Sequence, residues 1–199
     1  MKLLISTYNR KKLFEIKRIL AAFHWHLIDL AGVTPRVVVE ENAPTFKGNA
    51  MLKARALSRR FPSQVVVADD SGLVVPTLGG RPGIHSSRFS GEKKIDVENI
   101  AKLLLLMRNL KGSRRRAYFC CAVAIAHKGR IIKIAEARVY GRIAVRPQGR
   151  TGFGYDPVFI PRGYAKTFAV LGARVKDSMS HRTKAFLQAG YFIRRRFCR

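Results

Sequence analysis

Acidic residues are scarce in this chain, so each acid that is present is informative. Twelve Asp and Glu stand against 39 Lys and Arg among 199 residues, a formal net charge of 39 − 12 = +27. Such a balance favours a polyanionic partner: nucleic acid, a phosphorylated small molecule or an anionic membrane surface. The charge alone does not choose among these three.

Cysteines and long apolar runs are also few. The three cysteines are Cys120, Cys121 and Cys198, and an odd count with two neighbours excludes a disulfide framework and a zinc-ligand spacing. No apolar stretch approaches the roughly 20 residues of a membrane span. The apolar start at 1–6 is too short for a signal-peptide core. We therefore expect a soluble, cytoplasmic protein with no membrane segment.

Hydrophobic residues make up 47% of the chain, enough for a sizeable core in a single domain covering residues 1–199. Apolar periodicity predicts strands interleaved with helices, and therefore an α/β fold with a mixed sheet. The expected strands are 2–6, 26–30, 36–39, 65–68, 72–75, 116–126 and 130–140. The last two are expected to form a hairpin with its turn at 127–129. The expected helices are 11–23, one opening at 44–45, 96–107 and 180–193.

The most conspicuous acids are Asp69 and Asp70, which follow the apolar run 65–67 and precede Ser71-Gly72. Strand residues alternate between faces, so the two carboxylates should point to opposite sides. An isolated buried carboxylate is costly unless it is paired or binds a metal. Ser71-Gly72 is expected to form a turn with an open backbone. The alternative for the two acids is a capped, solvated strand end.

A second acidic pair, Glu40-Glu41, precedes the helix that opens at 44–45. Mg²⁺ takes one or two protein carboxylates and leaves the rest of its shell to water and phosphate. Glu41 and Asp70 would supply these two ligands if their segments converge. Solvated acids at a strand end are the alternative.

The segment 7–12 joins a predicted strand to a predicted helix. Such a loop offers free backbone N–H groups and the positive end of a helix dipole, which suit phosphate. Thr7 and Asn9 add donors, and Lys12 adds a charge. An ordinary capped helix start in a basic protein would have the same appearance.

Two further segments carry groups suited to a planar ligand. In Thr151–Pro157, Phe153 and Tyr155 could stack on a flat ring, as aromatic side chains do on bases, while Asp156 accepts from ring N–H groups. These aromatics could equally anchor a tight turn to the core. Ser180-His181-Arg182 opens the last predicted helix with cations that oppose its dipole. Its basic residues indicate an acceptor-rich ligand, or only the general basicity of the chain.

These blocks, in this order and with Asp-Asp-Ser-Gly at 69–72, resemble the Ham1/RdgB/ITPase family of non-canonical purine nucleoside triphosphate pyrophosphatases. The resemblance runs from Thr7 to about Arg182. It includes the stretches 49–54, 79–83, 88–91 and 166–169.

The resemblance implies Mg²⁺-dependent hydrolysis of ITP, dITP and XTP to the monophosphate and pyrophosphate, which cleanses the nucleotide pool. It also implies a long central mixed sheet with flanking helices, two lobes around an active-site cleft, and a homodimer. Glu41 and Asp70 match the metal-site acids, and Asp70 also matches the general base. The matching substrate-binding positions are Thr7, Asn9, Lys12, Ser71, Phe153, Gly154, Tyr155, Asp156, Lys176, His181 and Arg182.

The chemistry of these side chains is consistent with that activity. Lys12 and Lys53 could offset charge on the leaving pyrophosphate. Hypoxanthine and xanthine present a 6-keto acceptor and an N1–H donor, whereas adenine presents the reverse. Cationic Arg182 or His181 at the keto group, with Asp156 as acceptor, would leave ATP facing mismatched groups, worth factors up to roughly 10⁴–10⁵.

The chain departs from the family pattern at Tyr8, where glycine is usual, at Gly48, where glutamate is usual, and at Val170, which replaces a frequent glutamate. Gly48 removes a capping box with Thr45 and, if that glutamate helps the metal, one ligand. The charge of +27 is also unusually basic. It indicates either a basic background that spared the site or a nucleic-acid-binding protein on a degenerate pyrophosphatase scaffold.

Overall fold

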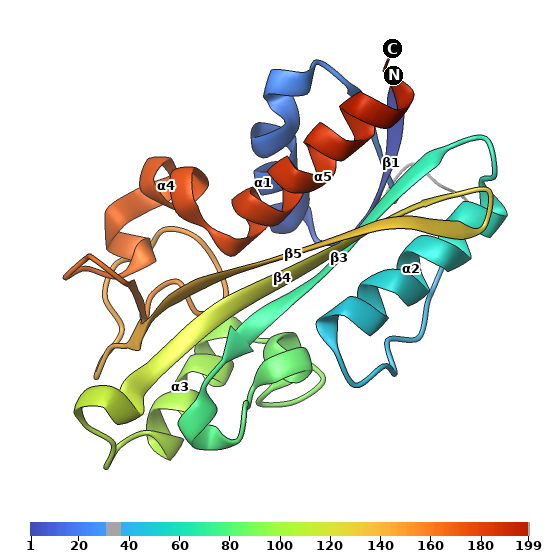
Figure 1. Cartoon of the computed structure of the whole chain (residues 1–199). Coiled ribbons are helices and arrows are strands. Elements are labelled where there is room, and N and C mark those ends of the chain that lie inside the picture. The colour runs from blue at the N-terminus through green and yellow to red at the C-terminus, as the bar shows by residue number, and fades with distance from the viewer. Residues whose placement is uncertain (31–36, 199) are drawn as a thin grey trace. The chain divides into compact units, whose positions relative to one another are not determined.

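The computed structural model describes residues 1–30 and 37–198 of the chain. A six-stranded mixed sheet has the order β2-β1-β3-β4-β5-β6 and carries helices on both faces (Figure 1). The strands are β1 (Lys2–Ser6), β2 (His26–Asp29), β3 (Val65–Val74), β4 (Arg116–His127), β5 (Arg130–Ile143) and β6 (Phe159–Pro161). The α-helices are α1 (Arg10–Leu20), α2 (Phe46–Arg60), α3 (Asp96–Leu106), α4 (Phe168–Met179) and α5 (His181–Phe197). Short 3-10 helices are η1 (Ala21–Phe23), η3 (Pro76–Leu78), η4 (Gly83–Arg88) and η5 (Gly112–Arg115).

The chain divides into two compact units. Unit 1 comprises Met1–Asp70, Cys121–Ala137 and Arg182–Arg199, and unit 2 comprises Ser71–Cys120 and Arg138–His181. The long strands β3, β4 and β5 each contribute residues to both units. The sheet is mixed because β1 pairs in parallel with β2 and β3, whereas β5 pairs antiparallel with β6. The predicted α/β fold with a mixed sheet and flanking helices is confirmed.

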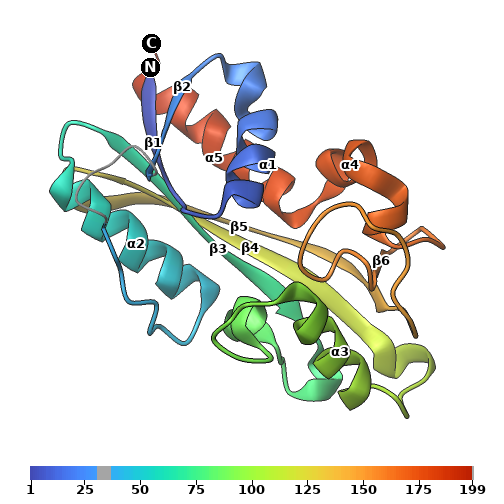
Figure 2. The ribbon, with the colours of Figure 1, turned by 180° about the vertical axis from the view of Figure 1, so that it is seen from behind.

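In unit 1 the alternation along the strands separates two cores. Odd-numbered strand residues, such as Ile5 and Val67, pack with Ile16 of α1 and Phe186 of α5. Even-numbered strand residues pack with α2 instead, as Val66 does with Leu57. Helices α1 and α5 accordingly cover one face of this part of the sheet and α2 covers the other (Figures 1 and 2). Whether a strand residue has an odd or an even number therefore decides whether it packs against α1 and α5 or against α2.

Unit 2 has its own core. Ile100 and Leu103 of α3 pack with Leu73, Phe159 and Phe168. The basic run at 114–116 is only partly a solvated face, because Arg115 is buried. Its guanidinium donates to the carbonyl oxygens of Met107 (2.7 Å), Ile143 (2.8 Å) and Ala144 (2.7 Å), which supports the end of β5.

Several expected elements differ from the structure. The strands expected at 65–68 and 72–75 form one continuous strand, β3, so Ser71-Gly72 is not a turn and the two Asp residues lie within the strand. The expected strand at 36–39 is not a strand over 37–39, and residue 36 lies outside the described residues. Helix α4, broken by the non-helical Gly172, was not predicted. The hairpin of β4 and β5 with its turn after His127 is confirmed.

Among the helices of residues 1–30 and 37–198, none has the length and apolarity needed to cross a bilayer.

Candidate active site

Asp69 and Asp70 lie on opposite faces of β3, as the alternation predicts. Asp69 faces α1 and α5: its Oδ2 lies 3.4 Å from Nζ of Lys12 and 3.9 Å from Nε of Arg182. Burial would raise the pKa of Asp69, but Lys12 and Arg182 outweigh it and lower the pKa to about 2. Asp69 is therefore charged at neutral pH and belongs to an ion-pair network with Lys12 and Arg182.

Asp70 faces α2, and its surroundings are different. Its Oδ2 accepts a hydrogen bond from Nδ2 of Asn49 at 3.1 Å. Burial raises the pKa of Asp70 above its usual value, Lys53 and Lys12 oppose this, and the negative charge of Glu41 adds to it. A carboxylate whose pKa is raised is a better proton acceptor near neutral pH than an exposed one.

Glu41 lies in the extended segment before α2, where Nζ of Lys53 lies 3.0 Å from its Oε2. Burial would lower the pKa of Lys53, but the surrounding carboxylates, Asp70 first, raise it. Glu41 and Asp70 both belong to unit 1, and both lie near the Lys53 ammonium. This donor set fits Mg²⁺, which needs only one or two carboxylates. No group of three or more His, Cys, Asp or Glu suited to a metal occurs in the described part of the chain.

The loop between β1 and α1 has the geometry expected of a helix N-terminus. Asn9 is the N-cap of α1, and its Oδ1 accepts from the backbone N–H of Lys12 at 3.1 Å. Oγ1 of Thr7 accepts from the N–H of Asn9 at 3.2 Å. These bonds order the loop, while the positive end of the helix dipole remains suited to an anion.

Gly48 is in the first turn of α2, whose N-cap Thr45 accepts from the Gly48 N–H at 3.0 Å. A Cβ at position 48 would lie 2.6 Å from Cβ of Ala43. This close approach leaves no room for the glutamate that the family pattern has there. The glutamate of the family pattern is therefore absent here, and the carboxylates near the Lys53 ammonium are those of Asp70, Asp69 and Glu41.

We expect Gly48→Ala to lower the free energy of unfolding by about 1–2 kcal/mol, because the overpacking cost exceeds the gain of about 1 kcal/mol in helix propensity. Urea denaturation checks this. The double variant Gly48→Ala with Ala43→Gly removes the contact and should recover the loss. A stabilised single variant would contradict the expectation.

The depressed pKa of Asp69 has a consequence for acid stability. Because the folded pKa of about 2 lies below the usual aspartate value of 3.8, Asp69 contributes about 2 kcal/mol at neutral pH. This contribution is complete above pH 3.8 and is lost as the pH falls toward 2. Urea titrations of metal-free protein between pH 6 and pH 2 should show this loss in the wild type. The same acid dependence in Asp69→Asn would contradict the assignment.

A second group of predicted residues lies in unit 2. Oδ2 of Asp156 is 2.5 Å from Nζ of Lys176 and accepts from the N–H of Phe153 at 2.9 Å. The Lys176 ammonium lies 4.6 Å from the ring centroid of Phe153. Gly152 has φ +81°, and a Cβ there would lie 2.2 Å from Oδ2 of Asp156. The loop therefore requires glycine at 152 to close around the Asp156–Lys176 pair.

Other predicted residues of unit 2 serve the core. Tyr155 is buried and donates from its hydroxyl to the carbonyl of Ser86 at 3.0 Å, which corresponds to the anchoring alternative. His181 is buried and stacks on Phe119, with ring centroids 4.7 Å apart and planes at 9°. The N–H of Gly154 donates to Oδ2 of Asp96 at 2.9 Å. Ser71 continues β3 and is half-buried.

Arg182, in unit 1, pairs with Glu15 of α1. Both side chains are buried. Burial would lower the pKa of Arg182, but Glu15 and Asp69 raise it. Glu15 was not predicted, although it is one of only twelve acids and occurs within an apolar helical pattern. Asn49, Asp96 and Phe119 were also not predicted as site partners.

The predicted residues are divided between the two compact units. The unit 1 group consists of Thr7, Asn9, Lys12, Glu41, Lys53, Asp70 and Arg182. The unit 2 group consists of Ser71, Phe153, Gly154, Tyr155, Asp156, Lys176 and His181.

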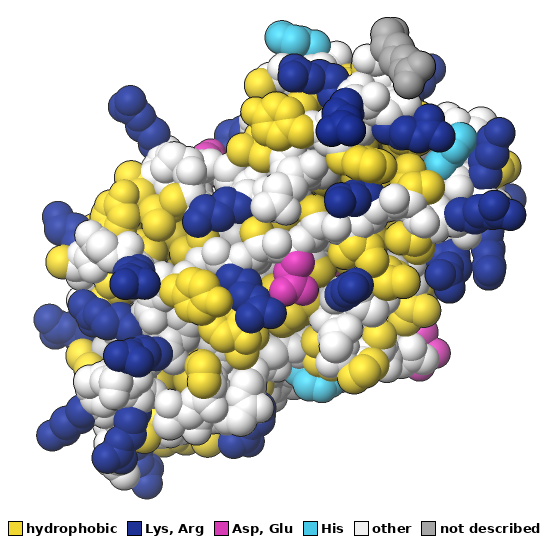
Figure 3. Space-filling view, in the orientation of Figure 1, with side chains coloured by type: hydrophobic (Ala, Val, Ile, Leu, Met, Phe, Trp, Pro, Cys, Tyr) yellow, Lys and Arg dark blue, Asp and Glu magenta, His cyan; other side chains and the backbone are white. Residues whose placement is uncertain are grey.

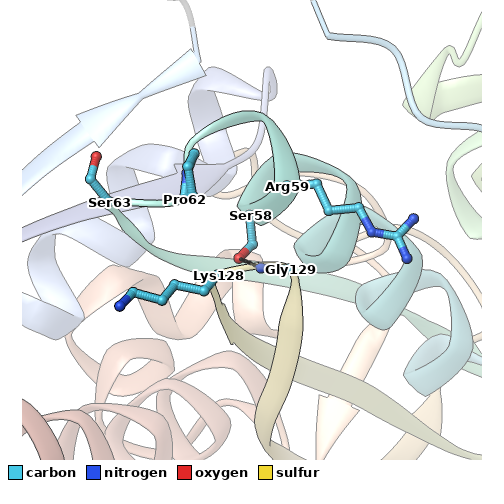
Figure 4. Close-up of a pocket in the computed structure, with 6 residues that line it drawn as sticks. All are labelled: Ser58, Arg59, Pro62, Ser63, Lys128 and Gly129. Carbon is cyan, nitrogen blue, oxygen red and sulfur yellow. Dashed lines mark hydrogen bonds between the residues drawn. The ribbon is translucent and has the colours of Figure 1, made fainter.

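A pocket of unit 1 contains none of these residues (Figure 4). It is lined by Ser58, Arg59, Pro62, Ser63, Lys128 and Gly129. The N–H of Gly129 donates to Oγ of Ser58 at 2.9 Å across it. The pocket lies where α2 ends, and the negative end of a helix dipole disfavours an anion. This pocket is therefore not the phosphate site expected from the sequence.

The mixed sheet, the helices on both faces and the ion pairs that Asp69 of β3 makes with Lys12 of α1 and Arg182 of α5 define an α/β protein with a polar site on β3. The Ham1 family model matches residues 3–191. The chain belongs to the Ham1 family.

Individual relatives agree with this assignment. A dITP/XTP pyrophosphatase of Bacillus subtilis is 41% identical over 92% of this chain and 91% of its own length. One from Geobacillus kaustophilus is 45% identical over 92% and 89%. The solved structure of the Staphylococcus aureus Ham1 protein has a TM-score of 0.86 and 37% identity, and covers 97% of this chain and 98% of its own.

Proposed function

We propose that this chain hydrolyses the non-canonical purine nucleoside triphosphates ITP, dITP and XTP to the monophosphate and pyrophosphate, with Mg²⁺, and so cleanses the nucleotide pool. The observation that carries the proposal is the buried Asp70 carboxylate, whose pKa is raised by burial, beside the Glu41 charge. Relatives that align with nearly the whole chain are named dITP/XTP pyrophosphatases.

Asp70 acts as the general base in this proposal. It takes the proton of a water whose oxygen attacks the α-phosphorus, and the bond from that phosphorus to the pyrophosphate oxygen breaks. Such a base contributes about 10²–10⁴-fold. Mg²⁺ held by Glu41 and Asp70 would neutralise phosphate charge and orient the triphosphate. Lys53 and Lys12 offset the charge of the pyrophosphate as it leaves.

The remaining predicted residues take up the substrate. Thr7 and Asn9, with the N-terminus of α1, bind phosphate oxygens. Within unit 2, the Phe153 ring is proposed to stack on the purine, and Ser71, Gly154, Tyr155, Asp156 and Lys176 are proposed as further substrate-binding residues. His181 or Arg182 is proposed to recognise the 6-keto group that distinguishes hypoxanthine and xanthine from adenine, with Asp156 as the acceptor for N1–H.

The test is a comparison of substrates. Purified protein is incubated with Mg²⁺ and ITP, dITP, XTP, GTP or ATP, and the monophosphate and pyrophosphate are separated by anion-exchange chromatography. We expect equimolar monophosphate and pyrophosphate, with kcat/KM for ITP and XTP at least about 100-fold above that for ATP. Release of inorganic phosphate, or equal use of ATP, would overturn the proposal. Omitting Mg²⁺ and adding EDTA should abolish turnover.

We also propose a homodimer and a cytoplasmic location, on the family resemblance. Light scattering coupled to size-exclusion chromatography measures the first, because a monomer and a dimer of this chain differ twofold in mass. The single catalytic domain predicted from the sequence, residues 1–199, comprises both compact units in this proposal.

Nucleic-acid binding is the second candidate, and one surface of unit 1 favours it. Arg194, Arg195 and Arg196 are exposed on α5, and none forms an ion pair with a described residue. The Arg194 guanidinium lies 5.6 Å from the ring centroid of Tyr191, which is 55% exposed. Arginines beside exposed aromatics suit single-stranded nucleic acid. Figure 3 shows Lys and Arg spread over this face with few acids.

A salt titration of two charge-matched variants shows whether nucleic acid binds at the α5 arginines or wherever the protein is positively charged. Fluorescence anisotropy of a labelled single-stranded oligonucleotide is measured between about 50 and 200 mM salt. Replacing the three α5 arginines with Gln should weaken binding at least about tenfold. Replacing Lys93, Lys94 and Arg108 with Gln removes the same charge from unit 2 and is the control. Equal losses would assign the binding to net charge alone.

A further inference from the structure

Tyr8, which stands where the family pattern has glycine, makes a two-way contact with the backbone of Val37. Its hydroxyl oxygen accepts from the Val37 N–H at 3.0 Å and donates to the Val37 carbonyl at 3.2 Å. One side chain thereby satisfies both polar groups of a residue 29 positions away. The pairing of a neighbouring strand would otherwise supply such bonds.

Val37 is the first described residue after 31–36, and residues 37–45 belong to no helix or strand. Glu41 lies near the middle of this segment. Two further side-chain contacts hold this segment: Nζ of Lys53 is 3.0 Å from Glu41 Oε2, and Asn49 Oδ1 accepts from the Ala43 N–H at 2.9 Å. Tyr8 is the third tether, at the opposite end of the segment from α2.

The three tethers lie beside residues that the proposed function uses: the phosphate-binding loop, Glu41 and Asp70. Tyr8 lies between Thr7 and Asn9 in the β1–α1 loop, and Asn49 also donates to Asp70 at 3.1 Å. No ladder of backbone hydrogen bonds joins residues 37–45 to another described segment. The place of the Glu41 carboxylate therefore depends on these side-chain bonds and on the packing of Val37 against the core cluster that contains Leu4 and Leu57. Each hydrogen bond to a neutral group contributes modestly, so the loss of one tether should loosen the segment without unfolding the protein.

We propose that Tyr8 is a positioning residue that couples the phosphate-binding loop to Glu41. Its hydroxyl holds segment 37–45 so that the Glu41 carboxylate stays beside Lys53 and Asp70, where the two acids can share one divalent cation. The part of this inference that concerns the cation rests on the proposed function. The tether between Tyr8 and Val37 does not. It also accounts for a bulky side chain at a position that a phosphate loop would leave open.

The variant Tyr8→Phe tests the tether, since it removes the hydroxyl and keeps the ring. Tyr191→Phe is the matched control, because Tyr191 is an exposed tyrosine of the same unit and its hydroxyl has no hydrogen bond among the described residues. Hydrogen exchange followed by mass spectrometry should show faster exchange in peptides covering 37–45 for Tyr8→Phe only. Unchanged exchange in these peptides would overturn the tether.

Cation binding tests the positioning role. Titration of the substrate-free protein with Mn²⁺, followed by electron paramagnetic resonance, should show affinity about three- to tenfold weaker in Tyr8→Phe than in wild type. If Tyr8 acts through Glu41, the substitution should have no further effect in a Glu41→Gln background. Additive losses, or equal affinities of Tyr8→Phe and wild type, would overturn the role.

These outcomes are distinguishable from failure of the proposed function. A wild type that binds Mn²⁺ and hydrolyses ITP, with an unaltered Tyr8→Phe, refutes only the role of Tyr8. A wild type that hydrolyses no purine triphosphate refutes the proposed function, while the exchange of peptides 37–45 still reports on the tether.

Discussion

Replacing Asp70 with Asn is expected to lower kcat for ITP hydrolysis by about 10²–10⁴-fold. The amide keeps the shape of the side chain and can still accept from Asn49, but it cannot take a proton from water. The same substitution should stabilise the metal-free fold. Because burial raises the pKa of Asp70, its ionised form destabilises the folded state at neutral pH. Activity and thermal stability should therefore move in opposite directions.

Glu40→Gln is the matched control for Asp70→Asn. Glu40 adjoins Glu41 in sequence and is exposed, so this variant removes one negative charge without removing a proposed ligand or base. Steady-state kinetics and thermal unfolding in EDTA should both resemble the wild type. If Asp70→Asn retains wild-type turnover, Asp70 is not the base. If it is instead less stable than wild type, the charge is not destabilising.

Replacing Glu15 with Gln is expected to lower the free energy of unfolding by about 3–5 kcal/mol. Glu15 pairs with Arg182, and both side chains are buried. Removal of one partner of a buried pair leaves the other charge without compensation. The carboxylate that remains near Arg182, that of Asp69, is 3.9 Å from its Nε and is also paired with Lys12. Urea denaturation of the metal-free protein measures the loss.

A less buried pair, between α1 and β2, provides the comparison. Lys17 lies 3.8 Å from Asp29, and its side chain is 49% exposed, so Lys17→Gln should cost less than about 1 kcal/mol. The double variant Glu15→Gln with Arg182→Met removes the uncompensated charge and should recover much of the stability lost by Glu15→Gln. Equal losses for Glu15→Gln and Lys17→Gln would show that the buried pair is not a major source of stability.

Local patterns were sufficient to predict much of the fold. Apolar alternation identified β1 and the hairpin of β4 and β5, because those strands are buried on at least one face. The same alternation placed Asp69 and Asp70 on opposite faces, which the contacts to Lys12 and Asn49 confirm. This alternation between faces can be predicted without knowing which elements pack against the strand.

The prediction of two strands at 65–68 and 72–75 was wrong, because they form the single strand β3. Ser71-Gly72 has the composition of a turn, yet the strand passes through it to Val74. Leu73 is fully buried in the core of unit 2, and this burial outweighs the weak local preference of Ser and Gly. The two acids therefore lie in mid-strand, where both are buried, and not at a solvated strand end.

The sequence by itself determined the family, the sheet-forming segments and the identity of the acids to be explained, since these depend on motif order and on residues close in the chain. Only the tertiary structure decided how the acids are paired. Glu15 meets Arg182 across 167 positions, Asp70 meets Asn49, and Tyr8 meets Val37. A pKa depends on burial and on charges brought near by folding. The scarcity of acids singled out Asp69 and Asp70, but their distinct electrostatic environments exist only in the folded chain.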